Sequence, residues 1–230
     1  VLRGDLASLG VGGYSLSAER IRKQGFAATQ FEVHIEAADK PHRHLKHIRE
    51  IIEKGRLPDL VRQRAMAIFT KLAEAEADAH GTSVEKVHFH EVGAIDSIVD
   101  IVGACILLEA LDPARVVISS LNLGSGTVKC AHGEMPVPAP ATAKLLEGVP
   151  VFSRGEPMER TTPTGAALAR VFASEFGTIP PGVIVRTGYG LGDADTELAN
   201  VLQGTLLEEA DLETGDAHLG RRGEGRRHRH

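Results

Sequence analysis

The segment that most constrains the fold is residues 94–111, which is apolar around almost its whole circumference. A helix of this kind has no solvated face and must be buried among other elements. The same segment carries two carboxylates, Asp96 and Asp100, one helical turn apart on one side. We therefore expect a buried helix with two acidic groups, each of which is costly unless it is paired or neutralised.

Two histidines and a glutamate directly precede this helix. His88 and His90 alternate along an expected short strand and so point to one side, and Glu91 falls in the turn that follows. A divalent cation would relieve the repulsion between Asp96 and Asp100, and imidazoles beside carboxylates are ordinary ligands of first-row metals. These residues predict a metal or catalytic site. The alternative is that Asp96 caps the helix and Asp100 pairs with a Lys or Arg.

A second group of histidines, His42, His44 and His47, lies near the start of another expected helix. His44 and His47 are three residues apart and share one edge of that helix. Adjacent helical turns can present two imidazoles to one metal ion. The alternative is an ordinary solvated helix face that carries basic residues.

Two further stretches are candidates for binding an anion. Gly124, Ser125 and Gly126 follow an expected strand, and small residues there let backbone N–H groups approach a phosphate, although such a loop is more often an ordinary turn. Thr162 and Thr164 open an expected helix, whose first amides and hydroxyls can bind an anion. Simple N-capping explains either threonine equally well.

Helix and strand patterns alternate along the chain. We expect helices at residues 1–9, 59–80, 94–111, 141–146 and 164–176, a helix from an N-cap at Asp39 to a stop at Gly55, and strands at 14–22, 27–35, 84–89, 116–123, 151–152, 183–186 and 201–207. Strands that alternate with helices predict an α/β or α+β domain in which a mixed β-sheet and packed helices form layers.

Composition excludes several classes of protein. No apolar run reaches the ~18–20 residues of a membrane span, and two cysteines are too few for a disulfide scaffold and fit a reducing compartment. Aromatic residues make up only 4% of the chain, which argues against a base-stacking surface. Five of the 26 basic side chains lie in residues 221–230, so the remainder is acidic and repels DNA phosphates. We expect a cytoplasmic protein whose partners are neither DNA nor a membrane.

The chain divides into one domain and a tail. We expect residues 1–210 to form the domain, and residues 211–230, which end in a Gly- and Arg-rich string, to be a disordered basic tail. Because the first residue is Val rather than Met, we expect residues upstream to be missing.

Four strings of residues, 88–100, 124–133, 135–142 and 162–166, resemble the LarC family of nickel insertion proteins and occur in the order of that family. The resemblance implies an enzyme of the lyase class, a nickel insertase or cyclometallase. Such a protein inserts Ni²⁺ into pyridinium-3,5-bisthiocarboxylic acid mononucleotide in a CTP-dependent step. The product is the nickel-pincer cofactor of lactate racemase and related enzymes, with nickel–carbon and nickel–sulfur bonds.

The resemblance also implies cofactors and partners. Mg²⁺ or Mn²⁺ would accompany CTP on a C-terminal domain that the family carries and that is not recognisable here, so the chain resembles the first half of the family. The lactate racemase apoprotein and a separate C-terminal half are implied partners, and a homo-oligomer is left open. The histidine-rich stretch of the family corresponds to His42, His44 and His47.

Each candidate residue thereby receives a predicted role. The predicted metal ligands are His42, His44, His47, His88 and His90; the predicted catalytic residues are His90, Glu91, Asp96 and Asp100; and the predicted substrate-phosphate residues are Gly124, Ser125, Gly126, Thr162 and Thr164. Two other functions compete with nickel insertion. One is a non-catalytic nickel store or chaperone that uses only the first histidine group, and the other is a divalent-metal phosphohydrolase that uses Asp96 and Asp100.

Overall fold

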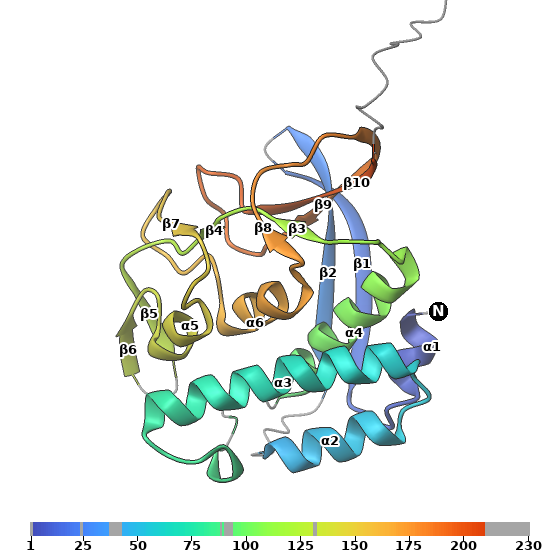
Figure 1. The fold of residues 1–230 in the computed structure, drawn as a ribbon, viewed down its shortest axis with the longest axis vertical. Coiled ribbons are helices and arrows are strands. Elements are labelled where there is room, and N and C mark those ends of the chain that lie inside the picture. Colours follow the sequence, from blue (N-terminus) through green and yellow to red (C-terminus); the bar gives the residue numbers. More distant parts are fainter. Residues whose placement is uncertain are drawn as a thin grey trace, which may run out of the picture.

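The computed structural model describes residues 2–23, 25–36, 43–87, 89, 94–130 and 133–209. Over these residues helices and strands alternate as the sequence predicts. The helices gather on one side of the molecule, and the longer strands rise from them on the other (Figure 1). The expected α/β class with a mixed sheet is therefore confirmed.

The main sheet has four strands in the order β1–β2–β9–β10. Their bounds are β1 (Tyr14–Lys23), β2 (Phe26–Ile35), β9 (Val183–Leu191) and β10 (Val201–Glu208). The pairs β1–β2 and β9–β10 are antiparallel hairpins, and β2 meets β9 in parallel at Thr29 and Gly190. The first and last parts of the described chain thus share one sheet.

Three smaller pairs of strands complete the β structure. They are β3 (Val117–Ile118) with β8 (Glu175–Phe176), β4 (Leu121–Asn122) with β7 (Val151–Phe152), and β5 (Thr127–Cys130) with β6 (Gly133–Pro136). The first two pairs are parallel and the third is an antiparallel hairpin. The expected strand over residues 116–123 is therefore split into β3 and β4, which pair with different partners.

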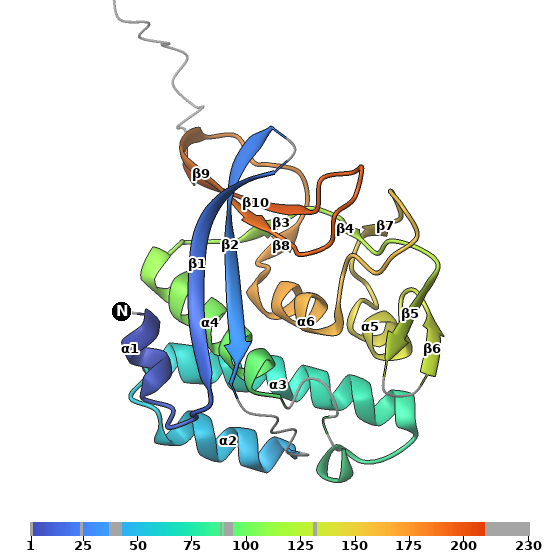
Figure 2. The same ribbon diagram turned by 180° about the vertical axis from the view of Figure 1, so that it is seen from behind.

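One long helix, α3, organises the others. The α-helices are α1 (Leu2–Ala7), α2 (Leu45–Lys54), α3 (Asp59–His80), α4 (Ile95–Leu111), α5 (Pro140–Leu145) and α6 (Pro163–Phe172). Helix α3 packs against α2, α4, α5 and α6, while α4 also contacts β2 (Figure 2). None of the described helices is long and apolar enough to cross a membrane.

The core lies between these helices and contains the apolar stripes that the periodicity predicts. Its largest fully buried side chains include Ile48 and Ile52 of α2, Ile68, Phe69 and Leu72 of α3, and Ile98, Ile101 and Val102 of α4. Each of these side chains contributes about 1.5–3 kcal/mol by leaving water. The expectation that α4 is largely buried is confirmed.

Three local predictions are wrong. Helix α2 begins at Leu45 with His44 as its N-cap, rather than at Asp39, which lies outside the described residues. The expected strand 84–89 is instead a 3₁₀ turn, Val84–Lys86, followed by a single β-bridge at Phe89. Helix α6 ends at Phe172, because residues 175–176 leave it to pair with β3.

Candidate functional site

The structure brings together two segments that carry the predicted histidines. The Phe89 backbone N–H donates to the Arg43 carbonyl at 3.1 Å, forming an isolated antiparallel bridge. The His44 ring lies next to this bridge and bonds the Val87 carbonyl. The start of α2 is thereby joined to the segment that leads into α4, although the two are 43 residues apart in sequence.

The His44 ring is held in place by a backbone carbonyl. Its Nδ1 atom lies 2.9 Å from the Val87 carbonyl oxygen. A carbonyl can only accept, so Nδ1 carries the proton and the lone pair of the neutral ring is on Nε2. Metal-ligating histidines commonly donate their other N–H to a backbone carbonyl in this way. The role of His44 as a metal ligand stays a prediction.

The His47 ring is engaged in the opposite sense. Its Nδ1 accepts the His44 backbone N–H at 3.2 Å, a bond that satisfies a donor at the start of α2. This acceptor role places the ring proton on Nε2 in the neutral tautomer. The two rings are 5.6 Å apart between centroids. His47 must give up its bond to His44 before its Nε2 can bind a metal ion.

Asp96 and Asp100 lie on the exposed side of α4 rather than within the core. This corrects the expectation that both carboxylates are buried. The apolar positions of α4 face the core, whereas the side of the helix that carries Asp96 and Asp100 faces solvent. The Asp96 carboxylate accepts the Ser97 N–H at 2.7 Å in the first helical turn, where the helix dipole favours an acid. The alternative that Asp96 caps the helix is wrong, because the N-cap is Ala94 and Asp96 lies within the first turn.

The pKa of the Asp100 carboxyl is raised even though this residue lies on the exposed face of α4. Neighbouring protein atoms displace part of its hydration and the Asp96 charge repels its own, which together raise its pKa to about 6. Within the described part of the chain, the structure gives Asp100 no ion pair with Lys or Arg. The predicted pairing of Asp100 with a cation is thus not found there.

The remaining members of the predicted metal site, His42, His88, His90 and Glu91, lie outside the described residues. Among the residues that the structure does describe, no three His, Cys, Asp or Glu side chains are grouped so as to hold a metal ion. Cys105 is fully buried, and burial raises its pKa to about 12, so its thiol is not a ready nickel ligand.

The glycine loop after β4 has a structural reason for its small residues. Gly124 has φ +79°, and a Cβ at this position would lie 1.8 Å from the Met158 carbonyl oxygen. Its N–H donates to the Asn122 side chain at 3.1 Å, and the Ser125 N–H donates to Met158 at 3.2 Å. These two amides are therefore already used inside the protein, and the predicted phosphate cradle at Gly124, Ser125 and Gly126 lacks them in this conformation.

Thr162 is the N-cap of α6, as one of the two open interpretations predicts. Its Oγ1 accepts the Gly165 N–H at 3.1 Å, and its carbonyl accepts the first helical bond from Ala166 at 2.9 Å. Thr164 is half-buried within the first turn. The hydroxyl of Thr162 is thus committed to the helix, which leaves its role toward a phosphate as a prediction.

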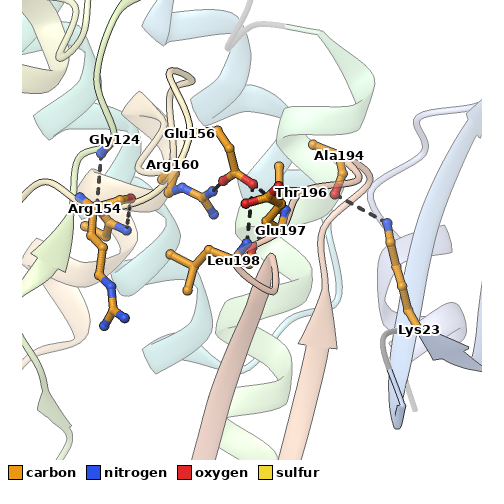
Figure 3. Close-up of polar contacts among 10 residues, drawn as sticks. Lys23, Gly124, Arg154, Glu156, Arg160, Ala194, Thr196, Glu197 and Leu198 are labelled. Atoms are coloured by element: carbon orange, nitrogen blue, oxygen red, sulfur yellow. Dashed lines mark hydrogen bonds and ion pairs between the residues drawn. The ribbon is translucent and has the colours of Figure 1, made fainter.

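A polar cluster that the sequence analysis missed lies beside this loop. Asn122, at the end of β4, holds the backbone of Arg154: its Oδ1 accepts the Arg154 N–H at 3.0 Å and its Nδ2 donates to the Arg154 carbonyl at 2.9 Å. Arg160 pairs with Glu156 at 2.6 Å, and the Glu156 carboxylate also accepts N–H groups from Glu197 and Leu198 (Figure 3). The one signal in the sequence is the density of charged residues over 153–160, where four of the eight residues are Arg or Glu.

Glu156 is held as a carboxylate by these contacts. Hydrogen bonding to its own backbone N–H, followed by the bonds from Glu197 and Leu198 and the charge of Arg160, keeps the pKa of Glu156 below its ordinary value. The cluster therefore ties the loop after β7 to the turn between β9 and β10.

Comparison with known proteins gives a consistent result. The family model described as "Nickel insertion protein" matches residues 1–221. A protein of Geobacter sp. (strain M21) named for nickel insertion is 50% identical over 213 residues, which cover 92% of this chain and 55% of that protein. The pyridinium-3,5-bisthiocarboxylic acid mononucleotide nickel insertion protein of Desulfitobacterium hafniense (strain DSM 10664 / DCB-2) is 45% identical over 215 residues, 94% of this chain and 53% of its own length.

The chain spans about half the length of the curated relatives it matches. No solved structure matches it. The family match nonetheless extends over nearly the whole chain and includes both histidine-bearing segments that the Arg43–Phe89 bridge joins. On this evidence the chain belongs to the nickel insertion protein family.

Proposed function

We propose that the chain binds Ni²⁺ and takes part in its insertion into pyridinium-3,5-bisthiocarboxylic acid mononucleotide. Membership of the nickel insertion family supports this proposal, as does the mononucleotide named for the Desulfitobacterium relatives. The observation that carries it is the His44 ring, whose Nδ1 bonds the Val87 carbonyl at 2.9 Å, an arrangement that is common among metal-ligating histidines.

Nickel is a substrate in this reaction, so the site has to capture the ion and later release it. Imidazole suits both steps because it binds Ni²⁺ through one nitrogen and yields to thiocarboxylate sulfur, a softer ligand. We propose His44 as the first ligand. The further ligands that we propose are His42, His47, His88 and His90. Recruiting His47 requires its bond from the His44 N–H to open, so nickel binding competes with a hydrogen bond at the start of α2.

The nickel–carbon bond replaces a ring C–H bond, so one proton has to pass to a base. We propose His90 or Glu91 as its acceptor, with Asp96 and Asp100 at the start of α4 assisting. A general base works best when its pKa lies close to the working pH. Asp100, with a pKa of about 6, is the described carboxyl that best meets this condition.

Several finer features belong to this proposal at the level of the whole protein. They are a lyase-class reaction that depends on CTP with Mg²⁺ or Mn²⁺, delivery of the cofactor to a lactate racemase-type apoprotein, a location in the cytoplasm, and cooperation with a C-terminal half. We assign none of them to a described residue.

The test measures nickel binding and cofactor assembly together. The purified chain is titrated with NiCl₂ by calorimetry, then incubated with NiCl₂, the mononucleotide, CTP and MgCl₂, and the nickel-containing product is measured by mass spectrometry. The full-length Desulfitobacterium relative is the positive control. His44→Ala should weaken nickel binding, whereas His34→Ala should not, because His34 lies on β2 and bonds Ser17. Equal nickel affinity in His44→Ala and the unchanged chain would contradict the proposal.

The same assay separates the two competing functions. A chain that binds nickel at His44 but yields no product beside an active control is a nickel store. Release of inorganic phosphate from nucleotides would indicate a phosphohydrolase. For that alternative, the structure shows that the Asp96 carboxylate already accepts the Ser97 N–H.

A further inference from the structure

A pocket of about 650 Å³ lies between the loops that follow β4 and β7 and the turn that joins β9 to β10. This volume is typical of sites for small organic ligands. The described residues that line the pocket include two arginines, Arg154 and Arg160, and no Asp or Glu. A site of this composition selects an anion.

Arg160 has a buried donor with no acceptor in the described protein. Its side chain is only 6% exposed, and its Nη2 pairs with Glu156, but its Nε has no hydrogen-bond partner. The guanidinium fits against Gly155, where a Cβ would lie 2.7 Å from Nη2. A buried N–H that lacks an acceptor costs free energy until a ligand supplies one. The planar guanidinium fork is suited to phosphate oxygens.

Arg154 supplies the second positive charge at the mouth of the pocket. Its side chain is exposed, and within the described part of the chain it forms no ion pair with an acidic group. Its backbone is fixed on both sides by Asn122, whose own carbonyl accepts the Thr161 hydroxyl at 2.7 Å. The arginine is therefore presented from a held loop, which lowers the entropic cost of binding a ligand.

The pocket also offers an apolar wall beside these charges. Phe152, 44% exposed on β7, lines it together with Leu191 and Leu198. An exposed aromatic ring stacks readily on a flat heteroaromatic ring. Because Glu156 neutralises one arginine, the net excess of positive charge is small and suits one phosphate monoester better than a triphosphate.

We propose that this pocket binds a mononucleotide, with its phosphate on Arg154 and Arg160 and its ring toward Phe152. The choice of a pyridine mononucleotide among nucleotides rests on the proposed function. The presence of an anion site rests only on the pocket and its arginines. This places phosphate recognition on arginine side chains rather than on the amides of the neighbouring loop at 124–126.

The experiment uses nicotinic acid mononucleotide as the probe, titrated by calorimetry into the purified chain. Arg154→Gln should weaken binding at least about tenfold, the usual effect of losing a charged hydrogen bond, while Arg154→Lys should recover part of it. Arg20→Gln is the matched control, because it removes the same charge from an exposed position on β1 outside the pocket. Arg160→Lys is the second variant, checked by circular dichroism for a retained fold.

The other results of these titrations distinguish this proposal from its alternatives. Equal affinity in Arg154→Gln, Arg20→Gln and the unchanged chain overturns the proposal, as does no binding of the probe. CTP that binds more tightly with the same dependence on Arg154 overturns the mononucleotide assignment in favour of a triphosphate site. Inorganic phosphate that binds as tightly as the probe overturns recognition of the nucleoside. Nickel binding, measured separately, should be unchanged in Arg154→Gln, so a failure of nickel binding and a failure of this pocket are distinguishable.

Discussion

His44 and Val87 are 43 residues apart in the sequence, yet the His44 Nδ1 atom lies 2.9 Å from the Val87 carbonyl oxygen. This bond fixes both the orientation and the tautomer of the ring. It also ties the histidine-rich start of α2 to the segment that enters α4. The described residues Arg43 and His44 therefore lie beside Val87 and Phe89.

The two described histidines of α2 should respond differently to substitution. His44→Ala should lower nickel affinity at least about tenfold, because it removes a ligand whose ring is already oriented. His47→Ala should change nickel affinity less and should mainly lower the melting temperature, because it removes the acceptor for the His44 N–H at the start of the helix. Calorimetry with NiCl₂ and thermal unfolding of both variants check this. A larger loss of nickel affinity in His47→Ala would contradict it.

Asp100→Asn should stabilise the metal-free protein at neutral pH. Loss of hydration, and then the Asp96 charge, raise the folded-state pKa of Asp100 from 3.8 to about 6. The folded state therefore binds this proton more tightly than the unfolded state, and stability is lost as the pH rises from about 4 through 6. Removing the charge should recover about 1 kcal/mol or less at pH 7.5, since the group is exposed and solvent screens it.

The gain from Asp100→Asn should be much smaller near pH 4, where the carboxyl of the unchanged chain is protonated in the folded state and partly protonated in the unfolded state. Asp96→Asn is the matched control and should instead destabilise, because it removes a charge from the first turn of α4 that accepts the Ser97 N–H. Chemical unfolding at pH 4 and pH 7.5 measures both effects. An equal gain in stability from Asp100→Asn at the two pH values would show that the titration of Asp100 is not the cause of that gain.

Much of the fold follows from local patterns in the sequence. The stripe of α3 and the apolar run of α4 predict both helices to within a residue, because each buries a face that spans several turns. Residues 84–89 contain enough apolar positions for a strand, but only Phe89 finds a bridging partner, Arg43. A strand depends on such a distant partner, which the local pattern does not contain.

The site is less predictable from the sequence for a related reason. Helical spacing correctly places Asp96 and Asp100 on one face, but it does not say whether that face meets the core or the solvent. The bonds of Asn122 to Arg154 and of Leu123 to Arg160 join loops that follow two different strands. No periodic pattern connects them, so only the folded arrangement of β4 and β7 brings them together.

Gly124→Ala should destabilise the fold strongly. The new Cβ would lie 1.8 Å from the Met158 carbonyl oxygen, and the backbone φ of +79° is itself unfavourable for alanine. We expect a loss of more than about 2 kcal/mol in the free energy of unfolding. Gly188→Ala is the control, because a Cβ there meets nothing within 4 Å. Urea unfolding of both variants measures the difference, and similar losses would show that the close contact at Gly124 relaxes easily.

Thr162 variants separate a helix cap from a phosphate ligand. Thr162→Ala should cost about 1 kcal/mol of stability, because the Gly165 N–H loses its acceptor. Thr162→Ser keeps the hydroxyl and should retain most of that stability. Thr164→Ala, within the same turn, should change stability less. If Thr162→Ser restores stability while binding of nicotinic acid mononucleotide is unchanged in all three variants, Thr162 acts only as a cap.

The two cysteines should differ sharply in reactivity toward a thiol reagent. Cys105 is fully buried in α4, and loss of hydration raises its pKa to about 12, so almost no thiolate forms at neutral pH. Cys130 is half-buried near the end of the β5–β6 hairpin, where its Sγ bonds the Gly133 carbonyl at 3.4 Å. In the folded protein the reagent dithiobis(nitrobenzoate) should therefore label one thiol, and the second should react only at the rate of unfolding. Cys130→Ser should abolish the early reaction. If an early reaction persists in this variant, α4 opens readily and the core is less closely packed than the structure indicates.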